Sequence, residues 1–271
     1  MPDSRSAPVT VPALRVAKRR NGHVPLVMVT AYDAPGARIA DAGGVDLILV
    51  GDSVANNVLG YEDTLQVTVA DMVHHTAAVA RAKPAPLIVA DLPWMSYHLD
   101  PVDTVRNGAA LIRAGAQAVK LEGGTNRVPM IEALVAAEIP VMGHLGLTPQ
   151  SVHAMGGYRV QAKDEEAALA LAADAKAVAA AGCFAVVIEG VPARVGTTVT
   201  ELLDVPTIGI GAGPDCDGQV LVLHDLLGIN AKTAKFVRRY AELADDATAA
   251  VAAYAADVRS GAFPADAEVY H

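Results

Sequence analysis

A series of six short apolar runs, most of them ending in a polar side chain, constrains the fold of this chain more than any other feature. Each run has the length and the β-branched content of a strand buried on both faces, and each is followed by a helix-like stretch. The runs are VDLILVGDS (45–53), PLIVADLP (86–93), AQAVKLEGG (116–124), PVMGHLGLTP (140–149), FAVVIEGVP (184–192) and PTIGIGAG (206–213). Strands that alternate with helices in this way predict a parallel sheet covered by helices.

The same pattern extends along the 271 residues as eight alternations of strand and helix. Helices are clearest in the amphipathic stretches 67–82, 101–115 and 164–182, the last of them with Asp164 as a predicted N-cap. Strands are predicted near 24–30, 45–51, 86–91, 116–121, 139–143, 184–189, 206–210 and 219–223. Eight repeats favour closure into a (β/α)8 barrel, a TIM barrel, over an open sheet.

The domain organisation follows from the lack of any linker rich in proline, glycine or serine. We expect a variable N-terminal segment over residues 1–22 and a single barrel domain with C-terminal helices over 23–271. Within the first segment, the basic run at 18–20 is interpreted as a solvated turn before the first strand, because short charge runs usually lie on the surface. The tail over 233–261 is predicted to form helices after the last strand.

Composition and charge exclude several classes of protein. A formal net charge of −9 argues against general binding of nucleic acid, which needs a basic surface. No uncharged apolar stretch is long enough to cross a membrane. The two cysteines, Cys183 and Cys216, form neither a disulfide framework nor a metal-site spacing, which is typical of a cytoplasmic protein.

Polar side chains with useful chemistry stand at or just past the carboxyl ends of the predicted strands. In a (β/α)8 barrel these ends converge on one mouth, where the active site is built. The residues are Asp52, Asp91, Lys120, Glu122, His144 and Glu189. Residues spread along the chain would therefore meet in one pocket, which predicts an enzyme.

Three of these residues are acids that follow the second, third and fourth strands. Asp52, Asp91 and Glu122 would form an oxygen-rich site suited to a hard divalent cation such as Mg²⁺. The alternative is that each aspartate caps the helix or turn that follows it. The spacing alone leaves both interpretations open.

Lys120 and Glu122 alternate with apolar residues along one strand, so both point the same way. A lysine that faced the helix layer would be costly without a partner, so the lumen or mouth is preferred. Lys120 could bind a substrate carboxylate there, or it could form a structural pair with Glu122.

Glu189 and His144 each allow two interpretations. Glu189 ends an apolar strand with no basic neighbour in sequence, so it could act as a general base or be a satisfied buried acid. His144 could donate a hydrogen bond to a substrate or hold a loop.

The segment after the seventh strand is rich in glycine. GIGAG (209–213) lacks the spacing of a dinucleotide-binding loop, and the following residues, PDCDGQ (214–219), have mostly turn chemistry. We expect a turn that lets the backbone approach a ligand.

The chain also resembles the ketopantoate hydroxymethyltransferase family, also called 3-methyl-2-oxobutanoate hydroxymethyltransferases, from about residue 26 to the C-terminus. Ordered motifs over most of a chain are far more specific than any one motif. The matching motifs are TAYD (30–33), VGDS (50–53), TVAD (68–71), ADLP (90–93), VKLEGG (119–124), GHLGLTPQSV (143–152), GGYRVQ (156–161), IGIGAG (208–213) and DGQ (217–219). Mild departures are Trp94, Ala162 and Gly190, where the family often has Phe, Gly and a bulkier residue.

This resemblance implies a (β/α)8 barrel of the phosphoenolpyruvate mutase/isocitrate lyase type. It implies transfer of a one-carbon unit from 5,10-methylenetetrahydrofolate to 3-methyl-2-oxobutanoate, which gives ketopantoate for pantothenate and coenzyme A synthesis. The family commonly forms decamers, so a homo-oligomer is expected.

The resemblance also implies roles for individual residues. Mg²⁺, or another divalent cation, would be bound by Asp52, Asp91 and Glu122. The keto acid would be bound by Asp52, Ser53, Asp91 and Lys120, with His144 as a further substrate-binding candidate, and Glu189 would accept the proton. The competing hypothesis is a Mg²⁺-dependent C–C lyase of the same superfamily; such lyases use a reactive cysteine in a glycine-containing loop, and neither cysteine lies in one here.

Overall fold

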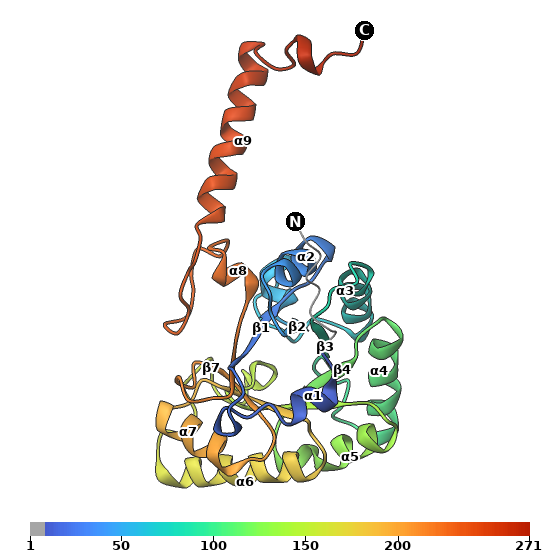
Figure 1. Ribbon diagram of the computed structural model, residues 1–271, viewed down its shortest axis with the longest axis vertical. Helices are drawn as coiled ribbons and strands as arrows, with labels where there is room; N and C mark the ends of the chain where they lie inside the picture. Colours follow the sequence, from blue (N-terminus) through green and yellow to red (C-terminus); the bar gives the residue numbers. More distant parts are fainter. Residues whose placement is uncertain (1–8) are drawn as a thin grey trace. The chain divides into compact units, whose positions relative to one another are not determined.

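The computed structural model describes residues 9–271, and within them eight parallel strands close into a barrel in sequence order (Figure 1). Each strand pairs with the next along the chain, and β8 pairs with β1 to complete the ring. The strands are β1 (Leu26–Thr30), β2 (Leu47–Val50), β3 (Leu87–Asp91), β4 (Ala118–Glu122), β5 (Val141–Gly146), β6 (Ala185–Glu189), β7 (Thr207–Ile210) and β8 (Gly218–Leu221). All eight overlap their predicted ranges, so the predicted barrel is confirmed.

Helices on the outside of the ring connect most of the strands (Figure 1). The three that the sequence marks most clearly, α3, α4 and α6, form where they are predicted. At the start of α6 the Asp164 side chain accepts a hydrogen bond from the Ala167 N–H at 2.9 Å, as expected of an N-cap. The helices of this part of the chain are α1 (Val11–Arg15), α2 (Ala34–Ala42), α3 (Val69–Arg81), α4 (Pro101–Arg113), α5 (Val128–Ala136), α6 (Glu165–Ala180) and α7 (Ala193–Leu202).

Shorter helical turns lie between these elements. A π-helical turn, η2 (Ala55–Leu59), follows β2, and 3-10 turns form η1 (Arg19–Asn21), η3 (Thr125–Arg127) and η4 (Pro149–Ser151). The turn η4 follows β5 and is the one that contributes to the site described below.

The connection from β7 to β8 has no helix, in agreement with its turn-rich sequence. Its glycines permit close packing within the protein: a Cβ on Gly213, which has φ of 88°, would lie 2.6 Å from the Cβ of Ala193 at the start of α7. Gly213 thus permits close packing against the barrel's own helix, and the approach of this segment to a ligand stays a prediction.

The lumen of the barrel contains an apolar layer and a polar layer on the same face of the strands. Side chains alternate between the two faces of a strand, so every second residue points inward. In β3 the inward residues Leu87 and Val89 belong to the hydrophobic core, and the next one is Asp91. In β4 the core residue Ala118 is followed by Lys120 and Glu122. The pleat thus places apolar side chains deep in the barrel and ionisable ones at the carboxyl ends of the strands.

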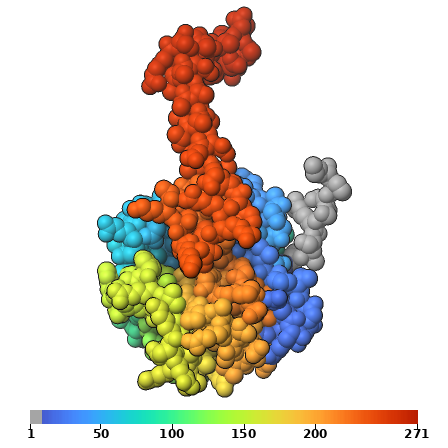
Figure 2. All heavy atoms as spheres, turned by 90° about the vertical axis from the view of Figure 1, so that its left-hand side faces the viewer, coloured from blue at the N-terminus to red at the C-terminus, as the bar shows by residue number. Residues whose placement is uncertain are grey.

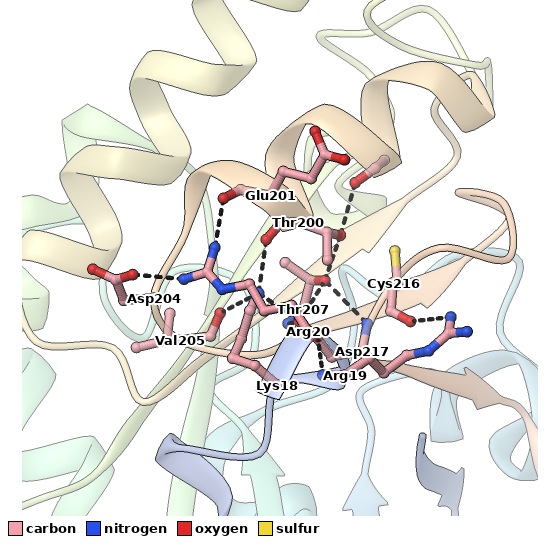
Figure 3. Close-up of polar contacts among 11 residues, drawn as sticks. Lys18, Arg19, Arg20, Thr200, Glu201, Asp204, Val205, Thr207, Cys216 and Asp217 are labelled. Carbon is pink, nitrogen blue, oxygen red and sulfur yellow. Dashed lines mark hydrogen bonds and ion pairs between the residues drawn. The ribbon is translucent and has the colours of Figure 1, made fainter. Parts of the chain in front are cut away.

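The opposite end of the barrel is closed by residues that precede β1. Leu14 and Ala17 join the hydrophobic core, and Lys18 is 1% exposed. Its Nζ lies 2.7 Å from Asp217 Oδ2 and donates to the backbone carbonyls of Thr200 at 2.7 Å and Val205 at 3.3 Å (Figure 3). The predicted solvated turn is therefore wrong for Lys18, because Asp217 and two carbonyls, all far along the chain, replace its water.

The rest of this network joins the starts of β7 and β8. Asp217 Oδ2 accepts from the Thr207 N–H at 3.0 Å, and Asp217 Oδ1 accepts from the Arg19 N–H at 2.9 Å. Arg19 and Arg20 are exposed, as predicted, and Arg20 pairs with Asp204 at 2.7 Å on the surface (Figure 3). We call Lys18, Thr200, Thr207 and Asp217 the base cluster.

The chain divides into two compact units, the second comprising Leu223–His271. This unit contains α8 (Leu223–Leu226), α9 (Leu243–Ser260) and the short turn η5 (Asp266–Glu268). None of the residues of α9 is buried. Figure 2 draws this unit in orange and red. Among residues 9–271, no helix combines the length and apolar character needed to span a membrane.

The tail is helical over only part of its predicted range. Residues 233–242 form turns, and the helix begins at Leu243. Lys235 follows Lys232 by three residues, and Arg238 and Arg239 follow Lys235 by three and four, so a helix there would align like charges on one face. Arg239 instead donates to the carbonyls of Asn230 and Ala231, both at 2.8 Å, and closes a loop.

Candidate active site

A pocket of about 110 Å³ lies at the carboxyl ends of the strands and is lined by all of the residues predicted to carry chemistry. Five ionisable side chains in it are 4% exposed or less, so they interact with one another rather than with bulk water. The predicted residues that line it are Asp52, Ser53, Asp91, Lys120, Glu122, His144 and Glu189. The structure therefore brings the whole predicted set together.

The two aspartates are in direct contact. The Asp52 N–H donates to Asp91 Oδ2 at 3.0 Å. Burial raises the pKa of Asp52 well above its ordinary value, and the neighbouring charges of Asp91 and Glu122 raise this pKa further. The pKa of Asp91 is raised too, chiefly by burial, although Lys120 opposes the shift. A cation that enters the pocket would therefore stabilise the ionised forms of both aspartates.

Lys120 supplies a positive charge in the middle of this acidic pocket. Its Nζ lies 3.0 Å from Asp91 Oδ1 and 3.1 Å from His144 Nδ1. Burial lowers the pKa of Lys120, but the charges of Asp91, Glu122 and Asp52 outweigh burial and raise it above the ordinary value, so the ammonium stays charged. The closest acid is Asp91, so the structure places Lys120 on Asp91 rather than in the isolated pair with Glu122 that the sequence allowed.

His144 lies between two glutamates. Its Nδ1 is 3.2 Å from Glu122 Oε1, and its Nε2 is 3.1 Å from Glu189 Oε2. Burial and Lys120 lower the pKa of His144, but the two glutamates outweigh them and raise it to about 9. This contact of Glu189 was not predicted, because its basic neighbour comes from the adjacent strand β5.

Tyr32 lies beside Ser53, which lines the pocket. The Tyr32 hydroxyl and Ser53 Oγ are 2.9 Å apart, and the backbone carbonyl of Tyr32 lies 2.7 Å from His75 Nδ1. Burial raises the pKa of Tyr32, so its phenol stays neutral. Tyr32 was not among the predicted site residues, although it belongs to the TAYD motif.

Gln150 and Tyr97 also reach the site and were not predicted. Gln150 lies in η4, is 5% exposed, and donates from its side-chain amide to Asp52 Oδ2 at 2.8 Å. Its backbone N–H donates to Glu122 Oε2 at 3.0 Å. The Tyr97 hydroxyl donates to Gln150 Oε1 at 2.6 Å. Only the position of Gln150 within the GHLGLTPQSV motif could have pointed to it.

The donor set can be tested for its fit to a metal ion. In the part of the chain that the structure describes, no three His, Cys, Asp or Glu side chains form a ready-made metal cage. Mg²⁺ seldom needs one, because it commonly uses one or two carboxylates together with substrate oxygens and water. Asp52 and Asp91 provide two adjacent carboxylates, and Glu122 is already engaged by His144 and Gln150. Hard oxygen donors with excess negative charge fit a magnesium ion that also takes ligands from a substrate.

Solved structures share this architecture. The fold is similar to that of 2,3-dimethylmalate lyase, described as a PEP mutase/isocitrate lyase superfamily member, with a TM-score of 0.63 and 20% identity over 96% of this chain and 91% of that chain. It is also similar to phosphonopyruvate hydrolase, solved with oxalate and Mg²⁺, with a TM-score of 0.59 and 17% identity over 96% and 91%. These likenesses confirm the fold. Together with the pocket, they define the protein as a (β/α)8 barrel with a site of ionisable side chains at the carboxyl ends of its strands.

Sequence relatives identify the family within this class. The family model described as ketopantoate hydroxymethyltransferase matches residues 8–266. The 3-methyl-2-oxobutanoate hydroxymethyltransferase of Methylobacterium sp. (strain 4-46) is 57% identical over 262 residues, which cover 96% of this chain and 90% of that protein. The protein of the same name from Pyrobaculum arsenaticum is 55% identical over 251 residues, which cover 93% and 95%. The chain belongs to the ketopantoate hydroxymethyltransferase family.

Proposed function

We propose that the protein transfers a hydroxymethyl group from 5,10-methylenetetrahydrofolate to 3-methyl-2-oxobutanoate and so makes ketopantoate for pantothenate and coenzyme A synthesis. Family membership supports the reaction. The observation that carries the proposal is the pocket, in which three acids, one lysine and the His144–Glu189 pair face the same small space. This set suits the removal of a proton next to a carbonyl group.

The proposed divalent cation is held by the carboxylates at the mouth. Asp52 and Asp91 are adjacent, and Glu122 completes the acidic wall. When bound, Mg²⁺ would polarise the keto group of the substrate. Asp52 and Asp91 would place the substrate's keto and carboxylate oxygens, with Ser53 beside them.

Lys120 is proposed to bind the keto acid and to stabilise its developing negative charge. The ammonium group is fixed by Asp91 at 3.0 Å and cannot move to bulk solvent, because Lys120 is 3% exposed. A positive charge held in a water-poor pocket interacts with an anion more strongly than it would in water. The net negative charge of the protein therefore does not prevent binding of an anionic substrate here.

Glu189 is proposed to accept the C3 proton of 3-methyl-2-oxobutanoate. His144 Nε2 lies 3.1 Å from Glu189 Oε2, so it orients the carboxylate and leaves Oε1 as the oxygen that takes the proton. The substrate carbanion that remains, stabilised as an enolate, attacks the methylene carbon carried by the folate, and a C–C bond forms as one of the two carbon–nitrogen bonds of that methylene breaks. Water then displaces the second nitrogen and supplies the hydroxyl oxygen, and the proton taken by Glu189 and one from water end on the two nitrogens of the released tetrahydrofolate. His144 is a further substrate-binding candidate, because it lines the same pocket as Glu189 and contacts that carboxylate.

The alternative of a C–C lyase lacks its characteristic thiol in this site. Cys183 and Cys216 are both buried and free, and neither lines the pocket. These free thiols are consistent with the cytoplasmic location that we also propose.

We further propose a homo-oligomer, the decamer of the family being the expected form. Helix α9 supports this, because Val251, Tyr254 and Val258 on it are each about half exposed or more. Light scattering on the purified protein tests the assembly.

The experiment that tests the function measures ketopantoate formation from 3-methyl-2-oxobutanoate and 5,10-methylenetetrahydrofolate, with and without Mg²⁺. Activity should require the metal and should be lost in Asp91→Ala, because one of the two adjacent carboxylates is missing. Full activity in Asp91→Ala, or in thoroughly chelated wild-type enzyme, would contradict the metal assignment.

A further inference from the structure

Gln150 contacts two of the four acids of the pocket, although it lies in the separate turn η4. Its side-chain Nε2 donates to Asp52 Oδ2 at 2.8 Å and to the carbonyl of Leu92 at 3.0 Å. Its backbone N–H donates to Glu122 Oε2 at 3.0 Å. The first amides of a helical turn have no partner within the turn, so this N–H is available to a carboxylate.

Tyr97 determines which way the Gln150 amide points. The Tyr97 hydroxyl accepts from the Glu122 N–H at 3.1 Å, so its own hydrogen is directed to Gln150 Oε1 at 2.6 Å. With Oε1 fixed as the acceptor, Nε2 must face Asp52. Tyr97 is 1% exposed, and the Arg127 guanidinium lies 5.4 Å from its ring centroid, so the ring has little freedom.

These contacts use every polar group of the Gln150 side chain and its backbone N–H. Nε2 has two hydrogens and two acceptors, and Oε1 has a donor. No polar atom of the side chain is left to bind a substrate, so Gln150 can act only through the acids that it touches. Gln150 is 5% exposed, and burying a polar amide costs free energy unless it is hydrogen-bonded, so packing alone does not explain a glutamine here.

We propose that Gln150 is a positioning residue that fixes the Asp52 and Glu122 carboxylates for a divalent cation, and that Tyr97 fixes Gln150. The inference rests on the proposed function, since it takes the cation site at Asp52 and Asp91 as given. Groups that orient metal-binding side chains commonly contribute ten- to a hundred-fold to metal affinity.

The test measures binding of Mg²⁺ alone, as MgCl₂, by isothermal titration calorimetry. Gln150→Met keeps the volume and removes the amide, and we expect a dissociation constant for Mg²⁺ that is at least about ten-fold higher than in the wild type. Tyr97→Phe removes one hydroxyl and should weaken binding in the same direction by less. Because both act on one amide, the double variant should bind no more weakly than Gln150→Met.

A matched control is Gln219→Met, because Gln219 is exposed and its Nε2 donates to the carbonyl of Gly213 in the β7–β8 connection. It should bind Mg²⁺ as the wild type does. Melting temperatures measured in EDTA separate stability from affinity, since a purely structural Gln150 would lower the melting temperature and leave the dissociation constant unchanged.

The outcomes separate the two proposals. If the wild type binds Mg²⁺ and both Gln150→Met and Tyr97→Phe bind it within about two-fold of the wild type, the positioning role is wrong and the function stands. If the wild type itself binds no Mg²⁺, the metal site of the proposed function is wrong. If Gln150→Met does not fold, Tyr97→Phe decides.

Discussion

The two ends of the barrel each bury charged side chains, but they treat them differently. At the base, Lys18 meets Asp217 at 2.7 Å, and carbonyl and N–H groups satisfy both of them. At the mouth, Lys120 and His144 face Asp52, Asp91, Glu122 and Glu189, which are too many acids for two cations. One end is balanced, and the other has an excess of negative charge.

This difference shows which end is built for stability and which for chemistry. A buried ion pair is tolerated when hydrogen bonds satisfy its remaining atoms, as at the base. At the mouth, burial and like charges raise the pKa of Asp52, which is a free-energy cost to the folded protein. A cation and an anionic substrate oriented by it would offset that cost.

The largest effect is expected for Glu189→Gln at the mouth. The amide keeps the shape of the side chain but cannot accept a proton, so exchange of the C3 proton of 3-methyl-2-oxobutanoate with deuterated solvent should slow by about 10²- to 10⁴-fold. Substrate binding and the melting temperature should change little, because one of the excess acids has been neutralised. Proton NMR measures the exchange without the folate step. Exchange at the wild-type rate would show that another group is the base.

At the base, Lys18→Met should destabilise the fold by about 3–5 kcal/mol, because Asp217 is left buried without its partner. Urea unfolding measures this, and the folded fraction should keep its activity. Arg20→Met is the matched control: Arg20 pairs with Asp204, but both are largely exposed, so less than about 1 kcal/mol is expected. A Lys18→Met variant as stable as Arg20→Met would remove the distinction between the two pairs.

Lys120→Ala at the mouth can be compared with Lys18→Met at the base, because each variant removes a buried lysine. Because Lys120 lies in the pocket, its loss should raise the KM for the keto acid by about 10- to 100-fold, equivalent to about 1.5–3 kcal/mol for a charged hydrogen bond. The barrel should still fold. Comparison of the melting temperature with turnover decides the role: lost stability with intact catalysis would make Lys120 a structural residue, like Lys18.

The smallest expected effect is the pH dependence of stability that arises from His144 at the mouth. The pKa of His144 is about 9 in the folded protein and about 6.5 when unfolded. The stabilisation from its protonated form is therefore complete below about pH 6.5 and is lost as the pH rises to about 9. Stability of the metal-free protein should fall by on the order of 2 kcal/mol across this window. In His144→Gln the fall should be clearly smaller; an equal fall in both proteins would assign it elsewhere.

The sequence predicted the barrel well because the information is local. Each buried strand is a short β-branched run, and the polar residue at its end identifies the mouth once the strands are known to be parallel. The contact between His144 and Glu189 could not be predicted from the sequence, because only the pairing of β5 with β6 brings the two residues together. The roles of the site residues, unlike their positions, stay predictions.

What could not be predicted depends on contacts between distant segments. Lys18 was expected in solvent because no nearby residue indicates its partners, which lie 182 to 199 residues away. Gln150 looks like any loop glutamine until η4 folds against the acids of β4 and the β2 loop.

Two of the positions at which the chain departs from the family pattern have left-handed backbone. Ala162 adopts φ of 52° and Gly190 φ of 57°, and only the glycine adopts this conformation without strain.

The base cluster has a consequence for how the protein is made. Ribosomes synthesise the chain from its N-terminus, so Lys18 emerges long before Asp217, and β1 long before its partner β8. Until about four-fifths of the chain has emerged, Lys18 has no Asp217 to pair with, and the ring cannot close. Completion of this barrel is therefore a late event in synthesis, and β1 stays without its closing partner until then.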